Sequence, residues 1–166
     1  MTLQIDDAGV GDLLSGVIIG AYRPETDRFD FEMVDVHFFQ KGRFRRKAYL
    51  TEVVSAVLLL VKRLGLSEEE PIQICSSFVF DKAVKELRSR YGESRVTVVK
   101  IVGKAQDKTE KAYLDELRKL GYEPIPDREE RRGRSFFHML RWLKKDRSRL
   151  AYAKTGWPRL RRYIRL

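Results

Sequence analysis

The stretch LQIDDAGVGDLLSGVIIGAY, residues 3–22, decides the fold. Its short apolar start, Leu3–Ile5, ends in the acidic pair Asp6 and Asp7, and the glycines that follow predict a turn. The apolar, β-branched residues Leu13–Tyr22 predict a second, buried strand. Two strands joined by a short turn are expected to pair in antiparallel fashion.

The rest of the chain alternates between strand and helix patterns. Residues Phe29–Phe39 alternate between apolar and polar and predict a third strand. Residues Ala48–Leu64 form a broad apolar face and are followed by Gly65, so they predict a central helix. The later elements are strands expected over Ile72–Phe80 and Arg95–Val102, and helices expected over Asp81–Tyr91 and Asp107–Leu120.

The order of these elements predicts the topology of the sheet. Strands four and five are each reached through a helix, so they should run parallel to the first strand in right-handed crossovers. We therefore expect an α/β fold with a five-stranded mixed sheet, three antiparallel strands followed by two parallel ones, flanked by helices. Residues 1–126 would form this domain, and residues 127–166 would form a basic C-terminal extension with a helix over Arg132–Lys145.

The charge of the chain is unevenly distributed. Acidic and basic residues balance over 1–126, so the whole net charge of +10 lies in 127–166. Such asymmetry predicts a polyanionic partner, nucleic acid or an acidic membrane surface, although a solvated basic face is the alternative. The longest apolar run, Val53–Val61, is too short to span a bilayer, and no signal peptide is visible, so we expect a cytoplasmic protein.

The basic extension predicts a nucleic-acid-binding surface, in which aromatic rings stack on bases and cations contact phosphates. The same aromatic residues could instead anchor the extension to the domain, its helix could cover the core or bind a partner, and the basic tail could dock an acidic protein. The candidate residues for nucleic-acid binding are Arg141, Lys144, Lys145, Lys154, Trp157, Arg159, Arg161, Arg162, Tyr163 and Arg165.

Two local sequences resemble the ribonuclease H superfamily. The acidic pair at 6–7, followed by Ala-Gly-Val-Gly at 8–11 and a second apolar strand, resembles the opening of type 2 ribonucleases H, in which Asp-Glu is followed by Ala-Gly-Arg-Gly. The run EVVSAVLLL at 52–60 is similar to the first helix of type 1 enzymes, which begins with a metal-binding glutamate. With the element order, the resemblance covers residues 1–122.

The resemblance implies a two-metal phosphodiesterase that acts on RNA, DNA or their hybrid with Mg²⁺ or Mn²⁺. It implies Asp6, Glu52 and Asp107 as metal ligands, with Asp7 and Glu110 completing the catalytic set. Simpler explanations stand beside these roles. An acidic Glu52 is favoured by the helix dipole in a first turn, and Asp107 with Glu110 could form a capping box.

The chain departs from the superfamily at the end of the fourth strand. The superfamily has a metal-binding aspartate there, whereas this chain has Cys75, Ser76 and Ser77. Thiols and hydroxyls are poor ligands for Mg²⁺, which prefers charged oxygen donors. The sequence therefore leaves two functions open, a divalent-metal-dependent nuclease and a catalytically inactive ribonuclease H-like protein for nucleic-acid binding or assembly.

Overall fold

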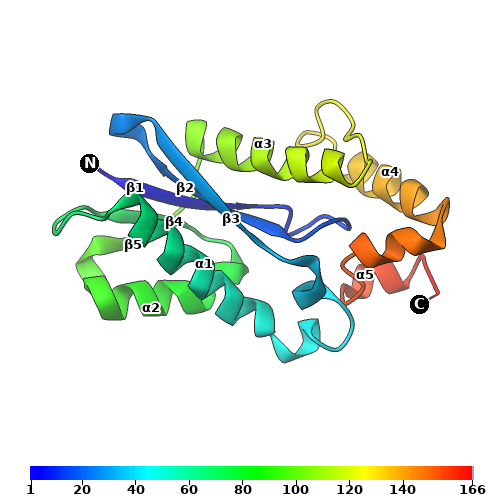
Figure 1. Cartoon of the computed structure of the whole chain (residues 1–166), viewed down its shortest axis with the longest axis horizontal. Coiled ribbons are helices and arrows are strands. Elements are labelled where there is room, and N and C mark those ends of the chain that lie inside the picture. Colours follow the sequence, from blue (N-terminus) through cyan, green and yellow to red (C-terminus); the bar gives the residue numbers. More distant parts are fainter. Residues whose placement is uncertain (166) are drawn as a thin grey trace.

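The computed structural model describes residues 1–165 and shows a five-stranded mixed sheet with helices on both faces (Figure 1). The strand order is β3-β2-β1-β4-β5. β1 pairs antiparallel with β2, and β2 with β3, while β4 and β5 run parallel to β1, so the predicted topology is confirmed. The strands are β1 Leu3–Ala8, β2 Val17–Arg23, β3 Arg28–Val34, β4 Ile72–Cys75 and β5 Val96–Val99.

The helices form two layers. On one face, α1 packs on β2 and β3, and α2 packs on α1 and β5; on the other face, α3 packs on β1 and β2. The bounds predicted for α1 and α2 are confirmed. The helices are α1 Ala48–Leu64, α2 Asp81–Tyr91, α3 Lys104–Lys119, α4 Arg132–Lys144 and α5 Pro158–Arg161.

The third helix begins earlier than the sequence pattern suggested. Its N-cap is Gly103, whose φ of 74° a glycine adopts without strain, and Asp107 lies within the first turn. The capping-box interpretation of Asp107 and Glu110 is therefore wrong, because the residue at the N-cap has no side chain.

Four predicted strands are too long: β5 covers only Val96–Val99 of the expected Arg95–Val102, and the extra pieces of the other three have local structure of their own. Leu14 precedes β2 and forms an isolated bridge with Ala153 in the C-terminal extension. Residues Val36–Phe39 form a 3₁₀ helix because the Asp35 carboxylate accepts the backbone N–H of His37. β4 likewise ends at Cys75, and residues Phe78–Phe80 form another 3₁₀ helix.

The main core lies between the sheet and α1. Ile5, Ile19 and Ile74, from three neighbouring strands, are fully buried beneath Val57 and Leu60 of α1. Every residue of β2 is buried, and all are apolar except Arg23 at its end, which forms a buried ion pair with Glu70 at 2.7 Å. Burial on both faces fixes the register of the central strands, because a slip by one residue would exchange their two faces.

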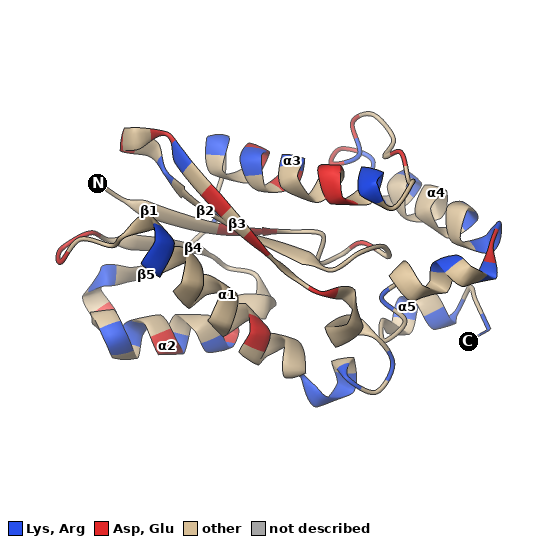
Figure 2. Cartoon of the chain, viewed as in Figure 1, with Lys and Arg blue, Asp and Glu red and all other residues tan. Residues whose placement is uncertain are grey.

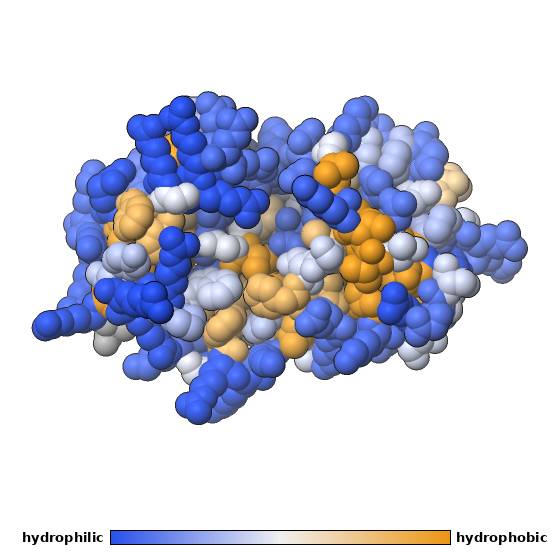
Figure 3. Space-filling model, turned by 180° about the vertical axis from the view of Figure 1, so that it is seen from behind, coloured by the Kyte–Doolittle hydropathy of each residue, from blue (hydrophilic) through white to orange (hydrophobic). Residues whose placement is uncertain are grey.

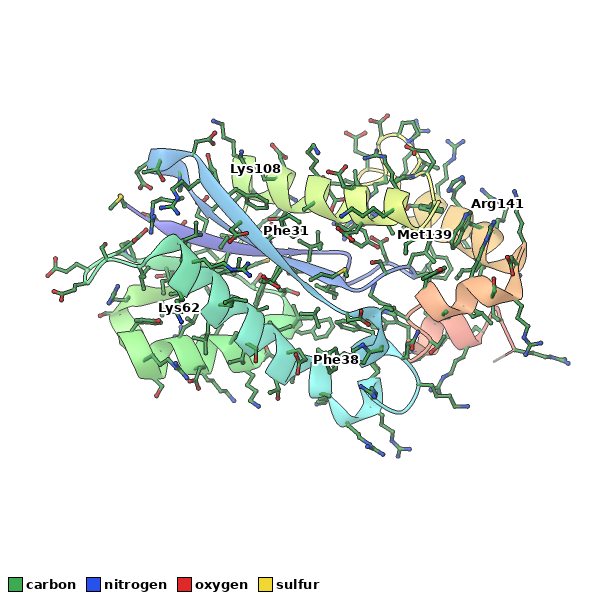
Figure 4. The ribbon with its side chains drawn as sticks, viewed as in Figure 1. Phe31, Phe38, Lys62, Lys108, Met139 and Arg141 are labelled. Atoms are coloured by element: carbon green, nitrogen blue, oxygen red, sulfur yellow. The ribbon has the colours of Figure 1, made fainter. Side chains whose placement is uncertain are left out.

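A second core joins the C-terminal extension to the domain. Met139 and Leu140 of α4 pack with Leu13, Ile18 and Tyr113 from the N-terminal part of the chain. α4 directs Met139 inward and Arg141 outward (Figure 4). The helix therefore covers the core, as one of the two sequence interpretations expected.

Lys154, which the sequence predicted to bind nucleic acid, lies inside the protein. Its side chain is fully buried, and its Nζ donates to the carbonyl of Leu14 at 3.1 Å, an oxygen that also accepts the hydroxyl of Tyr113 at 2.8 Å. Burial lowers the pKa of Lys154 to about 7. Lys154 is thus a structural residue that cannot contact a phosphate.

The surface divides by chemistry. Lys and Arg residues gather at the end of the molecule formed by α4, α5 and the loop before α1 (Figure 2). An apolar patch lies at the end that carries β5, an edge strand whose Val98 and the following Val102 are exposed (Figure 3). Among the residues described, no helix combines the length and apolar character needed to cross a membrane.

The burial of Lys154 gives a prediction for stability. A lysine whose pKa is depressed on folding costs stability below its unfolded pKa, since the unfolded chain binds the proton more tightly. We expect Lys154→Met to raise the free energy of unfolding at pH 7 by at least about 1.4 kcal/mol, the value of one pKa unit. Denaturant unfolding from pH 7 to pH 10 should show the difference from wild type shrinking as pH rises; a constant difference would contradict this account.

Candidate acidic edge and its pocket

Parallel pairing of β1 with β4 places their carboxyl ends together. Ile5 pairs with Ile74, so Asp6 lies beside Cys75. Asp6, Asp7 and Cys75 each offer a ligand atom, and these atoms lie within 4.8 Å of one another. Among residues 1–165, these are the His, Cys, Asp and Glu side chains that lie close enough together, as a group of three, to share a metal ion. We call these three residues the acidic edge.

Asp6 is the buried member of the acidic edge, and Cys75 beside it is half-buried. Asp6 is only 5% exposed, and burial raises the pKa of its carboxyl, although the thiol of Cys75 donates a hydrogen bond to it and partly opposes this. Burial and the charge of Asp6 raise the pKa of Cys75 to about 11. Cys75 is therefore a protonated thiol at neutral pH, which is a weak metal ligand.

Asp7 occupies the more open part of the acidic edge. Burial and the neighbouring charge of Asp6 raise its pKa to about 7, and a hydrogen bond with Ser77 partly opposes this shift. Two carboxylates this close disfavour simultaneous ionisation. At neutral pH the pair therefore carries less than two negative charges.

Asp7 opens into a pocket of about 360 Å³ at the end of β1. The turn from Gly9 to Gly11 forms part of its wall, and further parts come from α3, from the residues before and within α4, and from α5. The wall carries both signs of charge, so it can meet a ligand's phosphates as well as a cation. Its charged residues are Asp7, Asp12, Glu110, Arg128, Glu129, Arg132 and Arg159.

Arg128 neutralises two of the acids in the pocket. Its guanidinium contacts Asp12 at 2.6 Å, forms an ion pair with Glu110, and lies over the ring of Tyr113 at 5.2 Å. The three charged side chains are mostly buried, at 11 to 17% exposure. Burial raises the pKa of Glu110, whereas Arg128 opposes this by stabilising its charged form. The carboxylate of Glu110 is therefore already paired with Arg128.

The other predicted ligands do not join the acidic edge. Glu52 is half-buried on α1 and lies outside the group. Asp107 is exposed, and it lines a separate shallow pocket beside residues 123–130. Of the five predicted catalytic residues, the structure brings together Asp6 and Asp7, with Glu110 across the same pocket.

The sequence interpretation identified Arg159 but neither of the other two arginines of the pocket. Arg128 and Arg132 lie in the charged run DREERRGR at 127–134, a pattern typical of a solvated segment. Asp127, with a φ of 56°, turns the chain immediately before Arg128. The contact joins three residues that are far apart in the sequence, Asp12, Glu110 and Arg128, so no local pattern predicts it.

The donor set does not fit a pair of Mg²⁺ ions. A two-metal centre needs several ionised carboxylates that converge on one open space. Here the acidic edge supplies Asp6, Asp7 and a protonated thiol, while Arg128 holds Glu110. The pocket arginines would also repel a second cation.

Comparisons with known proteins identify no relative. A scan against protein-family models matches no family, and a search of the curated proteins finds no match. The function is therefore argued from the residues of this chain.

The Arg128 ion pairs give a test of the pocket's architecture. Arg128→Met would leave the carboxylates of Asp12 and Glu110 without their partner, and we expect it to lower the free energy of unfolding by about 3 kcal/mol. Adding Asp12→Asn and Glu110→Gln should restore much of the loss by removing the uncompensated charges. The measurement is denaturant unfolding at pH 7.

A surface arginine provides the matched control. Arg118 also contacts two acids, but its side chain is 46% exposed, so Arg118→Met should cost less than about 1 kcal/mol. Equal losses in Arg128→Met and Arg118→Met would show that burial does not strengthen the Arg128 contacts.

Proposed function

We propose that this chain is a ribonuclease H-like protein that binds nucleic acid, and that its acidic edge is not a two-metal hydrolytic centre. One observation carries the proposal. Cys75, and not a carboxylate, lies beside Asp6 at the end of β4, where the resemblance implies a metal-binding aspartate.

The sheet supports the ribonuclease H-like part of the proposal. Its order, with antiparallel β1 to β3 and parallel β4 and β5, agrees with the resemblance carried by residues 1–122. Asp6 lies near the carboxyl end of β1, where the resemblance requires the central acid. Fold alone does not establish an activity, so the site decides between binding and cleavage.

The charge distribution supports nucleic acid as the partner. The exposed cations of the extension lie at one end of the molecule, where a phosphate backbone could contact several of them (Figure 2). Arg132 and Arg159 extend this positive charge into the pocket at the acidic edge. The exposed cations predicted from the sequence are Arg141, Lys144, Lys145, Arg159, Arg161, Arg162 and Arg165.

The aromatic residues of the extension are mainly anchors. Tyr163 packs against Phe136 and Phe137 at ring-centroid distances of 5.5 and 5.7 Å, and it keeps 39% exposure. Trp157 is half-buried against the domain. Phosphate contacts should therefore dominate the affinity of the extension, with little stacking by these two rings.

Two other functions compete with this proposal. A Mg²⁺- or Mn²⁺-dependent nuclease is supported by the closeness of Asp6 and Asp7, and an acidic protein partner is supported by the positive charge of the extension. The nuclease requires ionised carboxylates at the acidic edge, while the protein partner requires only the basic surface.

Binding to short oligonucleotides tests the proposal. We expect measurable affinity for labelled DNA or RNA in fluorescence anisotropy. The logarithm of the binding constant should fall linearly with the logarithm of the salt concentration, because binding releases counterions. Arg161→Gln with Arg162→Gln should make that slope shallower by about 1–2, because each lost phosphate contact removes about 0.7–0.9. The control, Lys62→Gln with Lys85→Gln, removes two exposed charges on α1 and α2.

The same samples distinguish the competing functions. No binding to any nucleic acid at low salt would contradict the proposal and leave the acidic protein partner. Cleavage that requires Mg²⁺ or Mn²⁺, and that disappears on chelation and in Asp6→Asn, would instead establish the nuclease. Intact oligonucleotides after incubation with either metal are the expected result.

A further inference from the structure

An aromatic cluster connects the loop before α1 with the C-terminal extension and the loop after β4. The ring centroids of Phe44 and Trp157 lie 5.2 Å apart, and the ring of Phe78 is nearly perpendicular to those of Trp157 and Tyr49, at centroid distances of 6.4 and 6.2 Å. Phe44 also stacks on Tyr49 at 5.3 Å. We call these four residues the aromatic cluster.

Phe78 is the exposed member of the aromatic cluster. It remains 43% exposed, while Tyr49 is 5% exposed and Trp157 is half-buried. The next two residues, Val79 and Phe80, are fully buried and anchor the 3₁₀ helix that carries Phe78. A large ring is thus held at the surface by a fixed backbone and by the rings behind it. Binding a partner would therefore cost this side chain little conformational entropy.

The loop before α1 is fixed to the extension by hydrogen bonds. The backbone N–H of Lys41 donates to the hydroxyl of Thr155 at 3.1 Å, and the N–H of Gly156 donates to the carbonyl of Phe39 at 2.9 Å. The side-chain amide of Gln40 donates to two carbonyls of residues 151–153. The loop therefore has a defined position beside Trp157.

This loop is strongly basic. Its sequence, KGRFRRK at 41–47, surrounds Phe44 with five exposed cations and contains no acid. Within the part of the chain that the structure describes, these cations make no ion pair shorter than 4 Å with Asp or Glu. The cations, Lys41, Arg43, Arg45, Arg46 and Lys47, form the basic loop.

The aromatic cluster also neighbours the acidic edge. Phe78 directly follows Ser77, whose side chain is hydrogen-bonded to Asp7. Asp81, which raises the pKa of Tyr49 together with burial, lies on the α2 side of the cluster. An anionic ligand should therefore reach Phe78 from the side of the basic loop.

We propose that Phe78 and the basic loop bind a single-stranded segment of nucleic acid, with a base stacked on Phe78 and the backbone phosphates contacted by Arg45 and Arg46. This inference rests on the proposed function and specifies the form of nucleic acid that the protein prefers. A single strand can present the face of an unpaired base to an aromatic ring, whereas a duplex keeps its base faces stacked inside. One exposed ring among cations provides too little apolar area for a membrane or a hydrophobic partner.

Variants of Phe78 test the stacking. Phe78→Ala should weaken binding to a short single-stranded oligonucleotide about tenfold, as expected for loss of one base–aromatic stack, and should leave binding to the duplex of the same sequence unchanged. Phe78→Leu keeps apolar volume against Trp157 and should show nearly the same loss. The control is Phe31→Ala, because Phe31 on β3 (Figure 4) is 37% exposed and is flanked in the sequence by two acids, Asp30 and Glu32.

Variants of the basic loop test the phosphate contacts. Arg45→Gln with Arg46→Gln should reduce the slope of log affinity against log salt by about 1.4 for a single strand, or about 0.7 for each contact. Lys62→Gln with Lys85→Gln again controls for the loss of two charges. Thermal unfolding of each variant separates weakened binding from loss of the fold.

The outcomes separate this inference from the function on which it rests. If wild type binds single strands and duplex equally, and Phe78→Leu changes neither, the inference is wrong while nucleic-acid binding stands. If wild type binds neither form, both fail. Loss of binding to both forms in Phe78→Leu, with unchanged thermal unfolding, would also overturn the preference for single strands.

Discussion

The parallel pairing of β1 with β4 is the constraint on which the rest of the structure depends. In both strands, buried apolar residues are followed directly by a polar one. Asp6 follows Ile5 in β1, and Cys75 follows Ile74 in β4, so the pairing places these two polar side chains next to each other. The thiol of the half-buried Cys75 donates a hydrogen bond to the buried carboxyl of Asp6, which offsets part of the cost of burying that carboxyl. A carboxylate in place of Cys75 would add a second negative charge beside Asp6, which a cation could compensate.

The pocket shows a second solution to the same electrostatic problem. Asp12 and Glu110 face one another across the space beside Asp7, and Arg128 compensates both from the segment before α4. The guanidinium of Arg128 thus supplies the positive charge that a divalent ion would supply in a hydrolytic centre. This cation is covalently part of the chain, so Asp12 and Glu110 are compensated without an added ion.

The sequence predicted the sheet because its strands are apolar or alternating segments, the first three joined by turns and the last two reached through helices of clear periodicity. The bounds of α1 and α2 follow from their apolar faces and from the glycines that end them, Gly65 and Gly92. The acidic edge was predictable only in part. Asp6 and Asp7 adjoin one another in the chain, whereas the role of Arg128 depends on a contact between distant segments that no local pattern encodes.

The C-terminal extension explains why charge alone was an incomplete guide to function. Its positive charge suggested a solvent-facing arm, yet Lys154 is buried and Trp157 is packed between Phe44 and Phe78. Those inward contacts order the extension, and its outward arginines consequently have fixed positions relative to the acidic edge. A flexible arm could attract a polyanion but could not align it, whereas an anchored extension presents its cations to a polyanion in a fixed arrangement.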